Sequence, residues 1–336
     1  MKRPGFCSNR LFPTQGLRWA LRPPNVRCQS RPSTKTPGQR PPKPASRVRT
    51  ARHSALSRYR LSSETPVQPT YLQWEGIHGY LVGPEVGRGA YATVRLGLDA
   101  RADNREVAMK FYNNKLLFDA SRKQSLEREF KILATLRHPN ILEYVDAVET
   151  PNYTVLVTEY VVGQSLQAKL KTMPYHKLQE AEAQRAFLGL AQAVAYCHSQ
   201  QVAHRDITLD NVLVTAEYEV KLIDFGFATH MEPRRRVFCG TPSFMAPEIV
   251  ERKEHWGPPV DVWACGVVLY AMLCGELPFK ASRKDELYCK IKLGVYVVPD
   301  SVPPNARKLI QSMLANSPED RPTAAEILQS DWLAHL

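Results

Sequence analysis

The sequence predicts an α+β fold with two lobes, a small strand-rich lobe with one helix followed by a larger helical lobe, after a disordered basic tail. Three observations support this order. Basic residues and prolines are concentrated before residue 73, short apolar and β-branched runs dominate to about residue 162, and helical periodicities follow Gly163. We therefore expect a tail at 1–72 and one folded domain at 73–336, with its lobes at about 80–161 and 162–336.

The tail holds the net charge of the chain. Residues 1–72 contain 15 Lys and Arg against one acid, Glu64, which amounts to +14 in a chain of net charge +12, so the rest carries −2. An Arg-, Pro- and Ser-rich segment without periodic apolar residues cannot offset its ordering entropy by burial, so we expect disorder. Three roles stay open: a solvated leader adjusted by phosphorylation, a polybasic segment that binds an anionic surface or an acidic partner, and a mitochondrial transit peptide, whose amphipathic helix the prolines would interrupt. Specific nucleic-acid binding is not indicated, because no spacing combines aromatic with basic residues.

Cysteine usage and hydropathy indicate an intracellular protein. The seven cysteines are an odd number without a CxxC pair, which favours free thiols in a reducing compartment. The N-terminus lacks the apolar region of a secretory signal. The longest apolar run, Val262–Gly275, is too short to cross a bilayer and predicts a buried helix. We therefore expect no transmembrane segment and a cytoplasmic location, with the nucleus as an alternative and the mitochondrion as the less favoured one.

The two lobes follow from residue patterns. In the first, β-branched and apolar runs predict strands at Thr93–Leu98, Glu106–Phe111 and Thr154–Thr158. One helix is expected among them at about Arg122–Leu136, because apolar residues recur there at helical spacing. In the second lobe, the same criterion predicts helices at Ala181–Ser199, Val260–Cys274 and Ala306–Ala315.

A glycine-rich turn leads into the first of these strands, at Val86-Gly87-Arg88-Gly89-Ala90-Tyr91-Ala92-Thr93-Val94. Glycine lets a backbone approach phosphate oxygens closely and donate N–H groups to them, although an ordinary hairpin turn has the same signature. A dinucleotide-binding motif does not fit, because a strand and not a helix follows. The next strand places Lys110 in the apolar run Val107-Ala108-Met109-Lys110, and Glu129 on the predicted helix could pair with it. A lysine on a strand is otherwise usually solvated at its tip.

The strongest motif begins at His204-Arg205-Asp206. Asn211 follows, and thirteen residues later comes Asp224-Phe225-Gly226. Phosphoryl transfer needs a carboxylate beside the acceptor hydroxyl and oxygen ligands that hold Mg²⁺ on the phosphates. Asp206 suits the first task, and Asn211 with Asp224 suits the second.

These motifs resemble the eukaryotic protein kinase family from about Tyr80 to Leu336. Gly240-Thr241-Pro242 and Ala246-Pro247-Glu248 match the end of an activation segment, Asp261-Val262-Trp263 matches the helix that anchors the catalytic loop, and Arg321 is placed to pair with Glu248. His138-Pro139-Asn140-Ile141 and Gly257-Pro258-Pro259 are similar to the calcium/calmodulin-dependent group, especially its AMP-activated-kinase-like branch. The chain ends soon after Trp332, so we expect no calmodulin-binding autoinhibitory segment.

The resemblance implies ATP and Mg²⁺ as cofactors and a bilobal kinase fold. Lys110, oriented by Glu129, would hold the α- and β-phosphates, and Asn211 and Asp224 would bind the metal ion. Thr158 matches the gatekeeper, the backbone of Glu159 and Val161 would meet the adenine, and Val94, Ala108 and Leu213 would enclose it. Phe225, His204, Leu133 and Tyr144 match the hydrophobic column of active kinases.

Four departures from the family pattern bear on activity. Ala92 replaces the third glycine of the phosphate loop, which adds a methyl group where the backbone is tight. Thr208 stands where serine/threonine kinases usually have a lysine that offsets charge on the γ-phosphate, and losing one such donor typically costs ~10²–10³ in rate. Ser165 and Ala271 occupy two positions where basophilic relatives often carry acids. We therefore do not expect a strong preference for arginine before the target residue, although Asp210 keeps one acid in the catalytic loop.

The fourth departure is Val237, four residues before Thr241, where related kinases are commonly phosphorylated. Valine cannot be phosphorylated, Arg205 would lack its usual phosphate, and Arg234-Arg235-Arg236 would add repulsion. We expect activation without phosphorylation at that position, through an acidic partner or through another site such as Thr229 or Thr241.

The resulting hypothesis is a kinase that phosphorylates Ser and Thr of protein substrates, with Asp206 as base and with Thr241 typical of serine/threonine acceptors. The alternative is a pseudokinase scaffold with turnover impaired by Thr208. Retention of Lys110, Glu129, Asn211 and Asp224 together with Asp206 favours the enzyme.

Overall fold

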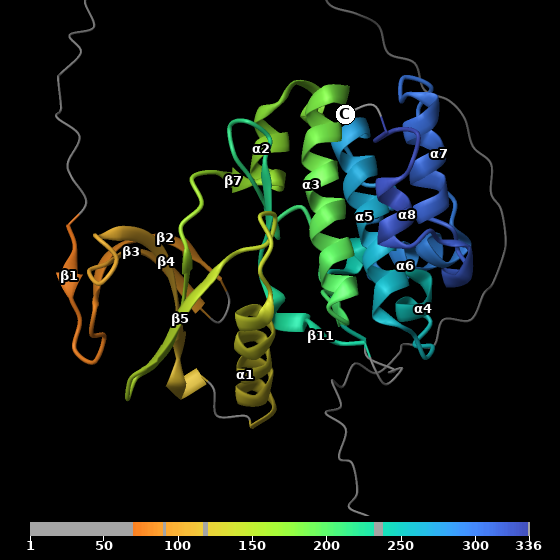
Figure 1. Cartoon of the computed structure of the whole chain (residues 1–336). Coiled ribbons are helices and arrows are strands. Elements are labelled where there is room, and N and C mark those ends of the chain that lie inside the picture. The colour runs from red at the N-terminus through yellow and green to blue at the C-terminus, as the bar shows by residue number, and fades with distance from the viewer. Residues whose placement is uncertain (1–69, 90–91, 117–119, 232–237, 335–336) are drawn as a thin grey trace, which may run out of the picture. The chain divides into compact units, whose positions relative to one another are not determined.

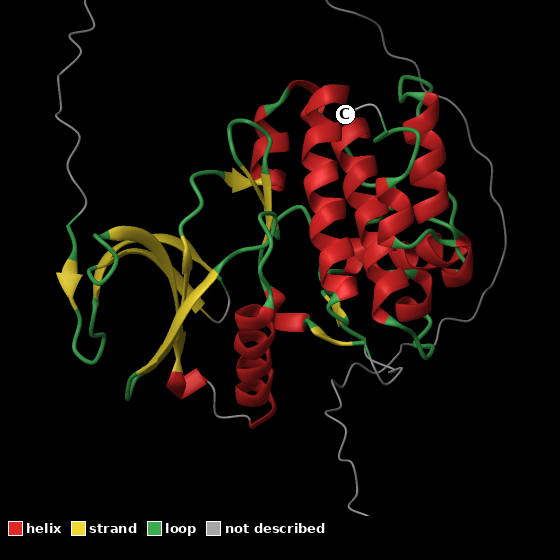
Figure 2. Cartoon of the chain, viewed as in Figure 1, coloured by secondary structure: helices red, strands yellow, loops and turns green. Residues whose placement is uncertain are grey.

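The computed structural model describes residues 70–89, 92–116, 120–231 and 238–334. Nearly all of the predicted tail lies outside these residues, as do Ala90, Tyr91, Arg234-Arg235-Arg236 and Val237. The described residues form a strand-rich lobe followed by a helical lobe (Figures 1 and 2), which confirms the predicted α+β class.

The first lobe is built on an antiparallel six-stranded sheet with the order β1-β2-β3-β4-β6-β5. Its strands are β1 Leu72–Gln73, β2 Tyr80–Arg88, β3 Ala92–Asp99, β4 Arg105–Asn113, β5 Tyr144–Glu149 and β6 Tyr153–Glu159. One helix, α1 Ala120–Thr135, packs against β5 and reaches the second lobe at the short 3₁₀ helix η3 Phe225–Phe227 (Figure 1). The three predicted strands and the predicted helix are confirmed within a few residues.

The second lobe is mainly helical. Its helices are α2 Leu166–Thr172, α3 Glu180–Ser199, α4 Pro247–Val250, α5 Gly257–Cys274, α6 Lys284–Leu293, α7 Pro304–Met313 and α8 Ala324–Leu328. Short strands complete it, namely β7 Gln164–Ser165, β8 Val202–Ala203, β9 Val212–Val214, β10 Val220–Leu222 and β11 Thr229–His230. The other 3₁₀ helices are η1 Asn114–Leu116, η2 Pro174–His176, η4 Pro242–Phe244 and η5 Pro318–Asp320.

Local sequence explains how the long helices begin and end. Helix α5 has two prolines in its first turn, where their missing N–H groups are not needed, and it ends at Gly275 with φ 77°. Helix α3 begins with a reciprocal cap, in which the N–H of Gln179 donates to Glu182 Oε2 at 2.9 Å. Helix α7 ends at Met313, two residues before the predicted end.

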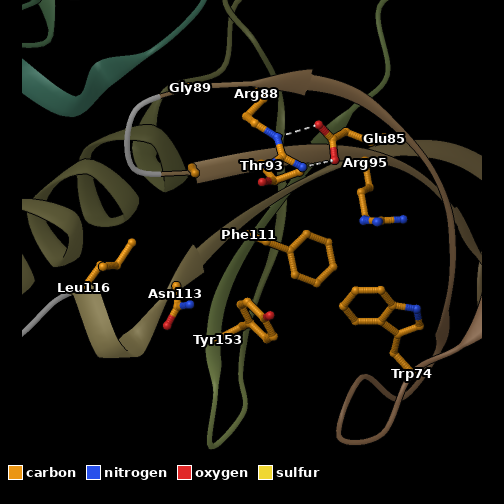
Figure 3. A pocket seen from close by; sticks show the side chains of 11 residues that line it. Trp74, Glu85, Arg88, Gly89, Thr93, Arg95, Phe111, Asn113, Leu116 and Tyr153 are labelled. Carbon is orange, nitrogen blue, oxygen red and sulfur yellow. Dashed lines mark hydrogen bonds and ion pairs between the residues drawn. The ribbon is translucent and has the colours of Figure 1, made fainter.

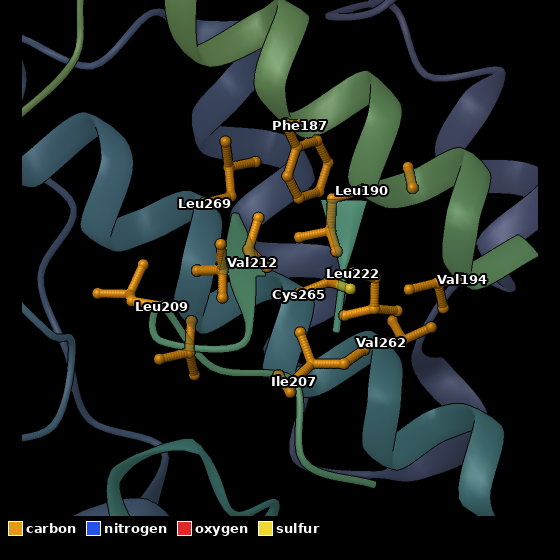
Figure 4. Packing of buried hydrophobic residues seen from close by; sticks show 14 of the residues in the cluster. Phe187, Leu190, Val194, Ile207, Leu209, Val212, Leu222, Val262, Cys265 and Leu269 are labelled. Carbon is orange, nitrogen blue, oxygen red and sulfur yellow. The ribbon is translucent and has the colours of Figure 1, made fainter. Parts of the chain in front are cut away.

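Helix α5 forms the centre of the second lobe. Almost all of its residues are buried, as the apolar run predicted. In the described part of the chain it is the one helix long and apolar enough to cross a membrane by length and composition, with a mean hydropathy of 1.4 and 83% of the window buried inside the protein. Helices α3 and α5, strands β9 and β10 and the loop residues Ile207 and Leu209 share one hydrophobic core (Figure 4).

Candidate active site

The loop between β8 and β9 is anchored to the core by a residue of α5. The carboxylate of Asp261 on α5 is fully buried and accepts the backbone N–H of His204 at 2.9 Å and that of Arg205 at 2.7 Å. Ile207 and Leu209 are buried in the hydrophobic core to which α3 and α5 also contribute (Figure 4). Because these contacts hold the loop backbone on one side, the polar residues between them are presented at defined positions on the other.

Asp206, Asn211 and Thr241 meet in this loop. Asp206 Oδ1 accepts both the N–H and the hydroxyl of Thr241 at 3.1 Å, and Asp206 Oδ2 accepts Asn211 Nδ2 at 3.1 Å. Asn211 Nδ2 also donates to the backbone carbonyl of Asp206 at 2.8 Å. Asn211 and Thr241, the latter 35 residues further along the chain than Asp206, therefore hold the Asp206 carboxylate in one orientation.

Thr208 is buried and turned toward the loop itself. Its side-chain oxygen accepts the N–H of Asn211 at 3.2 Å, and its backbone carbonyl lies at the same distance from that N–H. A short hydroxyl side chain commonly finds such a local backbone partner. Its hydroxyl is therefore used within the loop.

Replacing Thr208 by valine is expected to lower the free energy of unfolding by about 1 kcal/mol, because the N–H of Asn211 then loses one of two buried acceptors. Thermal unfolding should show a decrease of a few degrees in Tm for Thr208→Val. Thr208→Ser keeps the hydroxyl and is the matched control. Equal Tm values for Thr208→Val and wild type would show that the hydroxyl does not support the loop.

Lys110 on β4 connects the two lobes. Its Nζ lies 3.4 Å from Glu129 Oε1 on α1 and 3.3 Å from Asp224 Oδ1, 114 residues further along the chain. Burial alone would lower the pKa of Lys110, but the charges of Glu129 and Asp224 raise it well above its ordinary value. Burial raises the pKa of Glu129, an effect that Lys110 partly offsets. The pKa of Asp224 is lowered, because Lys110 outweighs the opposing effect of burial.

The Asp224-Phe225-Gly226 segment holds its carboxylate toward Lys110 by an uncommon backbone conformation. Asp224 has φ 61°, in the left-handed region, and its side chain accepts the N–H of Gly226 at 3.3 Å. Phe225 is buried and meets the His204 ring edge-on at 4.7 Å. Leu133 is buried in the same core, and Tyr144 packs against it from the side. Leu133 and Phe225 thus belong to one extended hydrophobic core, Tyr144 borders it, and His204 contacts it through Phe225.

The glycine-rich segment differs in part from the expectation. Val86, Gly87 and Arg88 belong to β2, and the turn is closed by the N–H of Gly89 donating to Ala92 O at 2.8 Å. Neither Gly87 nor Gly89 has a positive φ, and a Cβ on either would come no closer than 3.7 Å to its neighbours. Neither backbone strain nor packing within the protein therefore requires glycine at these two positions.

Two predicted residues of this segment point elsewhere. The side chains of Arg88 and Thr93 line a pocket of about 350 Å³ on the outer face of the sheet, among Trp74, Phe111 and Tyr153 (Figure 3). Arg88 is paired there with Glu85 at 2.7 Å. Phe111 follows Lys110 on β4, and successive side chains of a strand point to opposite faces, so this pocket lies across the sheet from Lys110. Only the backbone of Arg88 and Thr93 can belong to the Lys110 side.

The expected adenine contacts lie along neighbouring strands. In the sheet register Val94 is opposite Lys110, and Ala108 is opposite both Leu96 and Thr158. Thr158 is buried, and Leu213 is half-buried between two buried valines of β9. The Glu159 carboxylate binds Lys221 at 2.7 Å, so its side chain is engaged away from these residues. Among the described residues, none forms a hydrogen bond with the N–H of Val161, as an adenine-binding position requires.

The donor set fits Mg²⁺ bound with a phosphate ligand. Asn211 uses its amide nitrogen toward Asp206, which leaves its side-chain oxygen, and Asp224 supplies a carboxylate. The described residues contain no group of three His, Cys, Asp or Glu that could hold a metal ion by themselves. Mg²⁺ typically takes one or two protein oxygens together with phosphate oxygens, which agrees with this pair.

Ser165 and Ala271, the two positions where basophilic relatives often carry acids, offer no carboxylate. The Ser165 side chain caps α2 by accepting the N–H of Ala168 at 3.2 Å, and Ala271 is buried in α5. Arg321, by contrast, pairs with Glu248 as predicted, at 2.7 and 2.8 Å.

Sequence reasoning missed Tyr112, which is buried on β4 beside Lys110 and donates to Glu129. A signal was present, since residues two apart on a strand share a face. The motif Val107-Ala108-Met109-Lys110 ends at the lysine and therefore does not itself indicate Tyr112.

Comparisons with known proteins agree with the fold. A family model described as protein kinase domain matches residues 80–333. The chain is 37% identical over 258 residues to an SNF1-related protein kinase catalytic subunit alpha of Arabidopsis thaliana, covering 76% of this chain and 51% of that protein. It is 34% identical over 275 residues to the carbon catabolite-derepressing protein kinase of Saccharomyces cerevisiae, covering 81% and 43%. It is 35% identical over 261 residues to a probable serine/threonine-protein kinase, MARK-A, of Dictyostelium discoideum, covering 77% and 24%. The matched segment thus spans about half or less of each relative.

Proposed function

The chain belongs to the protein kinase domain family, and on that premise we propose that it transfers the γ-phosphate of ATP to Ser and Thr hydroxyls of protein substrates. The single observation that carries the proposal is the Asp206 carboxylate, held between Asn211 and Thr241 within a loop anchored on Asp261. A base for phosphoryl transfer must be positioned before the acceptor arrives, and three donors from two segments satisfy that need.

Each residue of the chain has a defined task in this proposal. Asp206 accepts the proton of the substrate hydroxyl as the oxygen attacks. Lys110, held by Glu129, orients the α- and β-phosphates, and Thr241 keeps Asp206 turned toward the acceptor. Asn211 and Asp224 hold Mg²⁺, which when bound neutralises charge that develops on the phosphates. The glycine-rich segment would donate backbone N–H groups to phosphate oxygens, and the backbone of Glu159 and Val161 would meet the adenine.

The second candidate is a nucleotide-binding scaffold without turnover. The observation that favours it is the inward direction of Thr208, whose hydroxyl is used within the loop where the family has a lysine. The ion pairs of Lys110 with Glu129 and Asp224 favour the enzyme, because a scaffold needs no complete set of catalytic charges. Both candidates bind ATP, so only phosphate transfer distinguishes them.

The test is phosphate transfer by the purified chain from Mg·ATP to a generic protein substrate, with and without a metal chelator. We expect transfer only with Mg²⁺. Asn211 and Asp224 offer oxygen atoms, which can hold phosphate oxygens only through a metal ion that binds both. Phosphoamino-acid analysis should find phosphoserine and phosphothreonine. Phosphotyrosine would contradict the acceptor class, and ATP binding without transfer by the folded protein would support the scaffold.

Location and tail partners are further parts of the proposal. Cys197, Cys239, Cys265, Cys274 and Cys289 are free thiols, which fits a reducing, intracellular compartment. The excess of positive charge in residues 1–72 supports an anionic surface or an acidic partner as the ligand of the tail.

A further inference from the structure

Tyr112 provides a second hydrogen-bond donor to the Glu129 carboxylate. Its hydroxyl lies 3.3 Å from Glu129 Oε1 and 3.4 Å from Oε2. Both side chains are almost fully buried, with 7% of Tyr112 and 4% of Glu129 exposed. A buried carboxylate is costly unless donors satisfy its oxygens. Lys110 reaches only Oε1, and in the described part of the chain Tyr112 alone donates to Oε2.

The placement of Tyr112 follows from the sheet. Lys110 and Tyr112 are two apart on β4, so both point to the face that α1 covers. The Tyr112 ring lies 6.1 Å from that of Phe130, the neighbour of Glu129 on α1, and Lys110 Nζ lies 5.3 Å from the Tyr112 ring centroid. The phenol is therefore held from the side by Phe130 while its hydroxyl faces the carboxylate.

The two donors differ in what else they bind. Lys110 is shared between Glu129 and Asp224, and its proposed task directs it toward the phosphates of ATP. Tyr112 donates only to Glu129 among the described residues. Burial, and next the charge of Glu129, raise the pKa of Tyr112 above its ordinary value, so the phenol keeps its proton.

We propose that Tyr112 is a positioning residue for phosphoryl transfer, whose hydroxyl holds Glu129, and through it Lys110 and helix α1, in the arrangement that the reaction uses. The inference rests on the proposed function and adds a residue to its site. It also provides a contact, built into β4, that favours this position of α1 without a modification of the activation segment.

Tyr112→Phe removes the hydroxyl and keeps the ring. In the full chain we expect kcat/KM for ATP to fall about tenfold, the low end for a hydrogen bond to a charged group. Tyr153→Phe is the matched control, because Tyr153 is on the opposite face of the sheet and its hydroxyl bonds no described residue. That control should stay within twofold of wild type. Tyr112→Leu, which also lacks the hydroxyl, guards against an effect peculiar to phenylalanine and should lose at least as much.

A pH profile separates positioning from a general loss of structure. The hydrogen bond from Tyr112 lowers the pKa of Glu129, which burial raises. Without it the carboxylate protonates at higher pH, so the acid limb of kcat/KM should move to higher pH in Tyr112→Phe. In a Glu129→Met background, which has no oxygen to accept the hydroxyl, Tyr112→Phe should cause no further loss.

The outcomes are distinct. If wild type transfers phosphate and Tyr112→Phe equals it, the inference is wrong and the proposed function stands. The inference is also wrong if the losses of Tyr112→Phe and Glu129→Met multiply, or if the acid limb does not move. If wild type does not transfer phosphate, the proposed function fails and the inference falls with it.

Discussion

Asp206→Asn is expected to lower kcat by about 10²–10⁴-fold, the usual contribution of a positioned general base. The amide has the shape of the carboxylate but cannot accept the proton of the substrate hydroxyl. The wild-type carboxylate accepts from three groups, namely Asn211 Nδ2 and the N–H and hydroxyl of Thr241. The asparagine amide instead directs an NH₂ group toward one of these donors. Steady-state transfer from Mg·ATP to a protein substrate measures the effect.

ATP affinity serves to interpret that result. Lys110, Glu129 and Asp224 are untouched by the change, so ATP binding should alter little while turnover falls. Asp103→Asn is a matched control, because Asp103 is exposed in the turn between β3 and β4 and has φ 51°, a conformation that asparagine also adopts. Its activity should equal that of wild type. Equal phosphate incorporation by Asp206→Asn and wild type would contradict Asp206 as the base.

The largest expected effect on stability comes from Arg321→Met. Every N–H of the Arg321 guanidinium has a partner: Glu248 at 2.7 and 2.8 Å, and the carbonyls of Ala315, Pro259 and Asn316. The side chain is fully buried and that of Glu248 is 6% exposed. Removing the arginine leaves a buried carboxylate uncompensated, which typically costs about 3–5 kcal/mol. We expect Tm to fall by roughly 10 °C.

An exposed ion pair provides the contrast. Lys280 and Glu276 are 2.7 Å apart with side chains 53% and 54% exposed, so Lys280→Met should change the free energy of unfolding by less than about 1 kcal/mol. A double variant, Glu248→Met with Arg321→Met, should recover part of the loss, since it removes the unpaired charge but not the unsatisfied carbonyls. A Tm for Arg321→Met within two degrees of that for Lys280→Met would show that burial does not set the strength of this pair.

Local patterns predicted three strands and four helices of the fold. Strands β3, β4 and β6 and helices α1, α3, α5 and α7 each carry an apolar period or run that reports their burial. Strand β5 was missed, because its residues are nearly all half-exposed and Asp146 interrupts its apolar run. The short helices α2, α4 and α8 were missed as well, since one or two turns offer too few repeats to show a period. Helix α6 was missed because only Leu287 and Ile291 of its ten residues are buried.

What the sequence determined by itself was the class of fold, and it also supplied the candidate residues of the site. Motifs such as His204-Arg205-Asp206 carry their chemistry in residue type and spacing, which need no coordinates. The tertiary structure decided which of these groups meet. Lys110 reaches Asp224 across 114 residues, Tyr112 reaches Glu129, Thr208 turns inward, and the side chains of Arg88 and Thr93 leave the site for the outer face of the sheet. These outcomes depend on strand register, on the packing of α1 against both lobes and on competition for buried hydrogen-bond partners, and no short stretch of sequence contains both sides of such a contact.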